Sequence, residues 1–218
     1  MNATIQSRSD AARWDVSPGM TAAGSTTTPR TRLLGAALIA APLLLLASSL
    51  ASAAGFEATR GVLGIYAFAT FALVVVTLTQ SFAATLPRAA AALTVLGVLG
   101  AAAGIGFSID AIHSTLPQSV ELIDDGGTAG VFVANVPGLM VPLAWIGIGI
   151  ALLRSGVQPR WCGAALVIAG LLFPVSRIGD IAALAVVGDL IFLLALAPLG
   201  WAIMQGRELL APGRKVDG

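Results

Sequence analysis

The dominant pattern in this chain is a series of six long apolar stretches separated by short polar segments. A helix needs roughly 20 apolar residues to cross a bilayer, and these stretches reach or approach that length. Because backbone in hydrocarbon must satisfy its own hydrogen bonds, we predict an all-α polytopic membrane protein, a bundle of six transmembrane helices. Pro174 is expected to kink or end the fifth helix. The predicted spans are 33–54, 61–86, 89–112, 129–153, 161–176 and 181–204.

Composition supports this class. Charged residues make up 11% of the 218 residues and hydrophobic residues 57%, whereas a soluble domain carries about 25% charged residues. The sequence therefore predicts one transmembrane domain, 30–206, a disordered cytoplasmic tail, 1–29, and a short cytoplasmic tail, 207–218. A net charge of +1 provides no bulk attraction for nucleic acid, so the lipid bilayer is the expected partner.

The first apolar stretch has a second interpretation. Arg30 and Arg32, the apolar residues that follow and the small residues 51–53 resemble a signal peptide with its cleavage site. The polar segment before them is long for a signal peptide, and the apolar run is long enough to span, which favours a retained helix. Cleavage remains the alternative, and it would leave five spans with the same orientation.

The distribution of basic residues predicts the orientation. Arg60 and Arg177 fall on one side of the predicted spans, and the other ten basic residues fall on the opposite side. The positive-inside rule places those ten, and both termini, in the cytoplasm. The alanine-rich, arginine-over-lysine composition is typical of bacterial proteins, so we expect a multi-pass protein of the plasma (inner) membrane. The ten residues are Arg8, Arg13, Arg30, Arg32, Arg88, Arg154, Arg160, Arg207, Arg214 and Lys215.

Asp189 is the most informative polar residue within a predicted span. It lies about eight residues inside the sixth span, or roughly 12 Å deep, where a carboxylate must face the bundle interior. With no cation nearby the neutral acid is favoured, and a proton-linked or ligand-anchoring role follows. The alternative is an interior hydrogen bond with no further function. Asn135 and Ser108 are the expected neighbours, and Asp189→Asn is expected to be tolerated.

A second group of polar residues lies at the predicted outer helix ends. Asp110 and His113 are three residues apart, as are Arg177 and Asp180, and this spacing brings side chains together on a helix. If these ends converge, they form a polar vestibule in which His113, the single histidine, could sense external pH. The alternative is that they are solvated interface charges.

The fourth span contains Asn135, which is expected to satisfy a carbonyl freed by nearby prolines, and which is a further candidate for a ligand site. In the third span, Gly100 and Gly104 form a G-x-x-x-G pattern that predicts close packing against a neighbouring helix of the same chain. Pro87 and Pro159 each precede an arginine and a similar apolar helix. These two helix pairs are either an internal repeat or share composition only.

Several functions are excluded because the residues they need are missing. The only lysine, Lys215, lies in the tail, so a retinal protein of the usual kind is excluded. The chain has no P-loop, and therefore no nucleotide site of that kind, and it has neither the H-E-x-x-H nor the G-x-S-x-G motif. No catalytic residue, metal ligand or cofactor is therefore assigned. The leading hypothesis is a non-enzymatic membrane protein that binds or moves a small solute, or a proton, through an outward-facing polar pocket. A structural or regulatory membrane partner is the alternative, and an intramembrane enzyme is third. The oligomeric state is left open.

Overall fold

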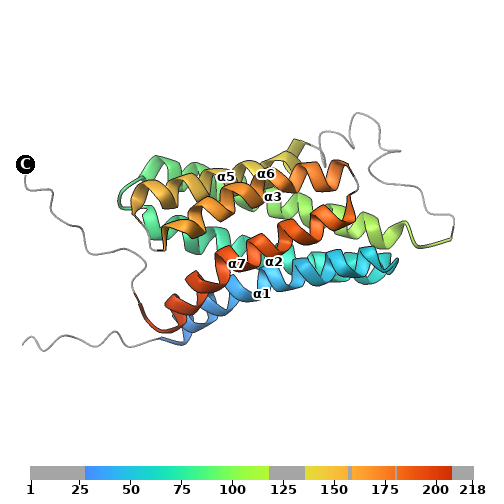
Figure 1. The fold of residues 1–218 in the computed structure, drawn as a ribbon, viewed down its shortest axis with the longest axis horizontal. Helices are drawn as coiled ribbons and strands as arrows, with labels where there is room; N and C mark the ends of the chain where they lie inside the picture. Colours follow the sequence, from blue (N-terminus) through green and yellow to red (C-terminus); the bar gives the residue numbers. More distant parts are fainter. Residues whose placement is uncertain (1–27, 118–135, 157–158, 180, 208–218) are drawn as a thin grey trace, which may run out of the picture.

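The computed structural model describes residues 28–117, 136–156, 159–179 and 181–207, and in these residues it is all-helical (Figure 1). Each of the six helices is long and apolar enough to cross a membrane. The predicted class, an all-α bundle of six transmembrane helices, is confirmed. The helices are α1 (Pro29–Ala53), α2 (Glu57–Phe82), α3 (Pro87–His113), α5 (Val136–Ser155), α6 (Arg160–Ile178) and α7 (Ala182–Met204).

Local sequence explains where several helices begin and end. Pro29 and Pro87 occupy the first turns of α1 and α3, where the missing amide hydrogen costs nothing. Thr28 caps α1, since its hydroxyl accepts a hydrogen bond from the backbone nitrogen of Thr31 at 3.3 Å. At the other end of α1, Gly55 adopts a φ of 79°, the left-handed conformation that ends many helices.

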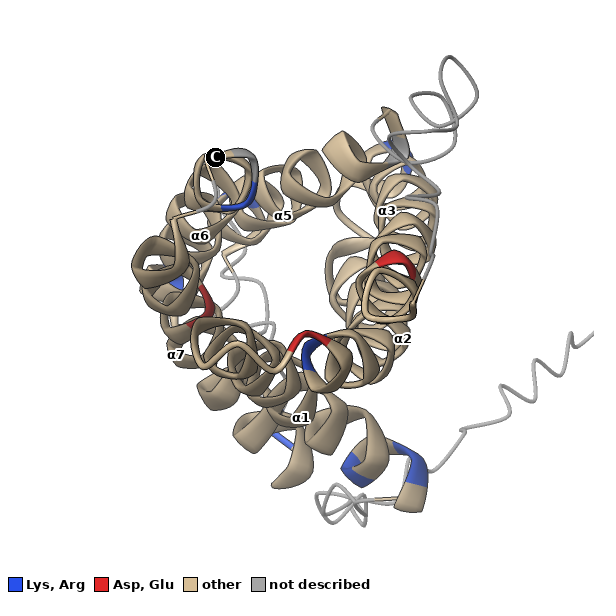
Figure 2. Cartoon of the chain, turned by 90° about the vertical axis from the view of Figure 1, so that its right-hand side faces the viewer, with Lys and Arg blue, Asp and Glu red and all other residues tan. Residues whose placement is uncertain are grey.

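The six helices form a closed ring in chain order. Each helix packs against the next one along the chain, and α7 returns to pack against α1 (Figure 2). Across the ring, the backbones of the described helices come close to each other only at α2 and α5. Consecutive helices run in opposite directions. Three helices therefore begin and three end at each end of the ring.

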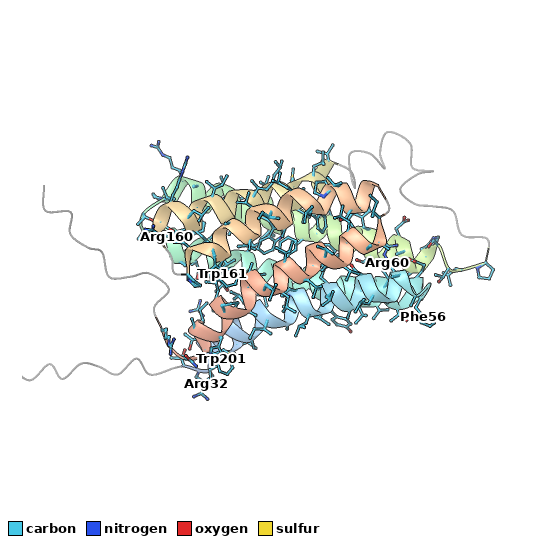
Figure 3. The ribbon with its side chains drawn as sticks, viewed as in Figure 1. Arg32, Phe56, Arg60, Arg160, Trp161 and Trp201 are labelled. Atoms are coloured by element: carbon cyan, nitrogen blue, oxygen red, sulfur yellow. The ribbon has the colours of Figure 1, made fainter. Side chains whose placement is uncertain are left out.

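The two ends of the ring differ in their basic residues. Arg32, Arg160, Trp161 and Trp201 lie at the end where α1 begins and α7 ends, whereas Arg60 lies at the opposite end (Figure 3). We call the first the terminal end and the second the loop end. The arrangement agrees with the grouping of charges on which the predicted orientation rests.

A layer of three aromatic side chains fills the middle of the six-helix bundle. Phe71 of α2, Trp145 of α5 and Phe192 of α7 are at most 3% exposed. Their ring centroids lie 5.1, 5.3 and 6.0 Å apart, in edge-to-face arrangements that aromatic side chains favour. Buried aliphatic side chains, among them Leu38 and Leu196, continue the core toward the terminal end.

The glycines of α3 confirm close packing within the chain. A Cβ on Gly100 would lie 2.8 Å from the backbone nitrogen of Val141 in α5. A Cβ on Gly104 would lie 2.5 Å or less from ring carbons of Phe68 in α2. Gly100 therefore allows α5 to pack closely against α3, and Gly104 allows α2 to do so on the other side.

Some predicted boundaries are corrected. Pro174 does not end the fifth helix, because α6 continues through it to Ile178; prolines are tolerated within membrane helices. The second helix begins at Glu57 and ends at Phe82, four residues earlier than predicted at each end. The first part of the predicted fourth span, 129–135, and most of both tails lie outside the described residues.

The orientation can be tested with reporter fusions. A reporter fused after the C-terminus is expected on the cytoplasmic side, because the terminal end carries the excess of arginine. A reporter inserted between α3 and α5 is expected on the opposite side. A C-terminal fusion that is active only in the periplasm would contradict the prediction.

Candidate functional site

A cavity of about 560 Å³ occupies the ring on the loop-end side of the aromatic layer. All six helices contribute to its wall, each through residues of the half that lies nearer the loop end. The apolar lining residues include Leu45, Phe68, Phe107, Leu139, Pro142 and Phe173. The polar lining residues are Ser48, Ser49, Ser52, Ser108, Ser176, Arg60 and Arg177.

The aromatic layer lies beneath this cavity, beyond its deepest lining residues, and none of its three side chains lines the cavity. Phe71 and Trp145 each follow a lining residue, Phe68 or Pro142, by three positions in a helix that runs away from the loop end. Phe192 likewise lies deeper in α7 than any lining residue of that helix. The cavity is therefore a recess between the loop end and the aromatic layer, which we call its aromatic floor.

An ion pair between α6 and α7 lies beside the cavity. The Nη2 atom of Arg177 donates hydrogen bonds to the carboxylate of Asp189, at 3.3 Å, and to the hydroxyl oxygen of Ser49, at 2.8 Å. The Ser49 hydroxyl in turn donates to the same Asp189 oxygen. Three helices, α1, α6 and α7, are thereby joined by one cluster of polar groups.

The two charges of this pair are unequally placed. The Asp189 side chain is 2% exposed and does not line the cavity, whereas the Arg177 side chain is 26% exposed and does. The guanidinium carbon of Arg177 also lies 5.6 Å from the centroid of the Phe173 ring, one helical turn earlier, within range of a cation–π contact. The guanidinium group of Arg177 therefore faces the cavity, while the carboxylate of Asp189 is buried behind it.

The sharp turn between α1 and α2 positions a second charged pair. The backbone nitrogens of Gly55 and Phe56 donate to the carbonyls of Ser52 and Ala51, both at 2.9 Å, which is the Schellman pattern of a helix end. Because this turn is short, the last turns of α1 lie next to the first turn of α2.

Arg60 and Glu57 form that pair at the mouth of the cavity. Arg60 Nη1 lies 2.7 Å from a Glu57 oxygen, and the Ser52 hydroxyl donates to the other carboxylate oxygen at 3.2 Å. The Ser48 hydroxyl donates to the Arg60 carbonyl at 2.9 Å. Arg60 lines the cavity, whereas Glu57 does not.

The neighbours of Asp189 differ from those expected. The Ser108 hydroxyl donates to the carbonyl of Gly104 in its own helix, at 2.8 Å, and Asn135 lies outside the described residues. The neutral-acid expectation assumed that no cation was near, and Arg177 makes that premise wrong. Asp189 is joined to the cavity wall through its hydrogen bonds with Arg177 and Ser49.

The other vestibule candidates are placed as follows. Arg177 turns inward to Asp189, while Asp180, the partner that the sequence spacing suggests, lies outside the described residues. Asp110 and His113 are in the last turn of α3, and neither lines the cavity. The Nδ1 atom of His113 is buried and has no hydrogen-bond partner among the described residues.

The serines of α1 are the residues that sequence reasoning missed. Ser48, Ser49 and Ser52 stand at positions i, i+1 and i+4 of an otherwise apolar helix, which places them on one side of it. That cluster was the available signal, but residues 51–53 also fit a cleavage site. The structure places all three hydroxyl groups in the cavity wall.

The described residues contain no group of three or more His, Cys, Asp or Glu side chains placed to hold a metal ion. The side chains that line the cavity offer hydrogen bonds through hydroxyl and guanidinium groups and contacts with apolar groups.

Comparison with protein-family models, with curated proteins and with solved structures finds no match. The fold and the site define the class: a multi-pass integral membrane protein with a cavity among its helices, near the loop end.

Proposed function

We propose that this protein binds a small amphiphilic solute in the recess at its loop end. The observation that carries the proposal is the cavity of about 560 Å³, whose lining includes both apolar and polar side chains. Ligand pockets in proteins are commonly about 300–1,000 Å³, mostly apolar, with a few polar groups that fix orientation. With the predicted orientation, the recess lies toward the outside of the cell.

A purely structural role accounts for less of the site. It explains the hydrogen-bonded cluster of Ser49, Arg177 and Asp189, because such groups hold helices together. It does not explain why the described residues leave the interior beside that cluster unfilled, since protein interiors are usually close-packed. In the binding proposal, Asp189 is a positioning residue for Arg177.

The test uses Ala182→Trp, which fills the recess, and Ala183→Trp as a matched control. Both alanines are exposed residues in the first turn of α7, but only Ala182 lines the cavity. In lipid nanodiscs, we expect at least one of 1-decanol, decanoate and decyltrimethylammonium to raise the melting temperature saturably, because a ligand bound to the folded state stabilises it. Ala182→Trp should remove this rise and Ala183→Trp should keep it.

Cys162 provides the readout. It is the single cysteine of the chain and is 1% exposed, so a thiol-reactive dye should label it only as the protein unfolds. It lies near the start of α6, at the end away from the recess. A melting temperature that none of the three compounds raises, or a rise that Ala182→Trp leaves unchanged, would overturn the proposal.

A further inference from the structure

The charged groups that face the recess are both cations. Among the described residues, Arg60 and Arg177 line the cavity, while their partners Glu57 and Asp189 do not. The four charges sum to zero, so the site is not cationic as a whole. A ligand in the recess nevertheless meets the two guanidinium groups first.

Both guanidinium groups are held in place before any ligand arrives. Arg177 is fixed through Nη2 by Ser49 and Asp189, and Arg60 through Nη1 by Glu57. A guanidinium group carries five N–H donors, so these bonds leave donors on both side chains for a further acceptor. A preorganised cation loses less conformational entropy when it binds.

The two cations also act on each other. Arg60 and Arg177 come from α2 and α6, and both line the same cavity, where their like charges repel each other. An anion between them would offset this repulsion and accept hydrogen bonds from both. The hydroxyl groups of Ser49 and Ser52 each have a single donor hydrogen, which they give to Asp189 and Glu57. The donors left for an anion are therefore those of the two guanidinium groups.

We propose that the ligand is an anionic amphiphile, whose carboxylate or phosphate group lies between Arg60 and Arg177 and whose apolar chain points toward the aromatic floor. Arginine suits this role because its planar donor pair matches the oxygen atoms of carboxylate and phosphate groups. The apolar side chains Leu45, Phe68 and Pro142 line the deeper part of the recess, where the chain would lie. This inference rests on the proposed function and assigns the sign of the ligand's charge.

The experiment measures binding to the full-length protein in neutral-lipid nanodiscs by calorimetry, with empty nanodiscs subtracted. The probes are decanoate, decyl phosphate, 1-decanol and decyltrimethylammonium, which share a chain and differ in charge. Acetate and inorganic phosphate are added as anions without a chain. We expect decanoate and decyl phosphate to bind at least about tenfold more tightly than the other four probes.

Two variants remove the cations without leaving an unpaired buried charge. Arg60→Gln acts at the mouth, and the double variant Arg177→Gln with Asp189→Asn replaces the inner ion pair by two amides. Each is expected to weaken decanoate binding by about tenfold or more, while 1-decanol binding stays within about twofold. Arg160→Gln, which removes an exposed cation at the terminal end, is the control and should leave decanoate binding unchanged.

The outcomes separate this inference from the proposed function. If 1-decanol and decyltrimethylammonium bind in the recess as tightly as decanoate, the solute site stands and the anion inference is overturned. If acetate or inorganic phosphate binds as tightly as decanoate, the chain is not recognised and the amphiphile is overturned. If Ala182→Trp affects none of the decyl probes, the proposed function itself fails.

Discussion

Substitution of Gly200 by valine is expected to lower the free energy of unfolding by about 1–3 kcal/mol or more, the usual cost of overpacking. Gly200 of α7 lies against Gly35 of α1 at the contact that closes the ring. A Cβ at position 200 would lie 2.5 Å from the Gly35 carbonyl oxygen and 2.9 Å from the Leu38 Cβ. Both are atoms at or next to the backbone, so the helices themselves must move apart.

Gly106→Val is the matched control for this substitution. Gly106 is an exposed residue of α3, and a Cβ there would meet nothing within 4 Å. The same change should therefore alter the free energy of unfolding by no more than about 0.5 kcal/mol. Thermal unfolding followed by Cys162 labelling measures both variants. Equal melting temperatures for Gly200→Val and Gly106→Val would show that the α1–α7 contact does not limit stability.

The spans were predictable because the bilayer imposes a simple rule. A chain that crosses hydrocarbon must be helical and apolar for a fixed length, so hydropathy alone indicates where the helices lie. The error at the start of α2 arises because the helix extends beyond the apolar run into polar residues. The error at its end arises because residues 83–86, which are largely apolar, form the turn before α3. Glu57 and Arg60, counted as loop, are the first turn of that helix.

The partners of Asp189 were not predictable by the same rule. In α7, Leu194 is 61% exposed and Leu196 is fully buried, although both are leucines. When a helix is apolar on every side, its sequence does not indicate which side faces inward or which helix is its neighbour. Ser49 and Asp189 are 140 residues apart and meet only because α7 closes the ring against α1.

Depth alone did identify Asp189 as an inward-facing residue. It is the eighth residue of α7, and its side chain is almost fully buried, as a carboxylate in a membrane helix should be. The sequence also contained its cation, Arg177, but twelve positions away and across a helix connection. Arg177 was paired with the nearer Asp180 because spacing rules apply within one helix.

The ion pair reverses the expected effect of Asp189→Asn. We now expect this variant to lower the free energy of unfolding by about 1.5–3 kcal/mol, as for a lost hydrogen bond to a charged group. Breaking a fully buried ion pair costs more, about 3–5 kcal/mol, but Arg177 faces a recess, where its charge is partly solvated. The amide can still accept from Ser49, so the loss is mainly that of the countercharge.

The double variant Arg177→Gln with Asp189→Asn tests this cause. Because it removes both charges, it should be more stable than Asp189→Asn alone, since replacing a whole buried pair is often neutral. A double-mutant cycle over the two sites then gives their coupling energy, which we expect to exceed about 1 kcal/mol.

Glu57→Gln is the matched control for Asp189→Asn, because it makes the same acid-to-amide change in the other pair. The Glu57 and Arg60 side chains are 37% and 38% exposed, and an exposed pair contributes only about 0–1 kcal/mol. Asp189→Asn should therefore melt at a clearly lower temperature than Glu57→Gln. If the two variants melt together and the cycle gives no coupling, the buried pair does not join α6 to α7, and Asp189 does not hold Arg177 at the recess.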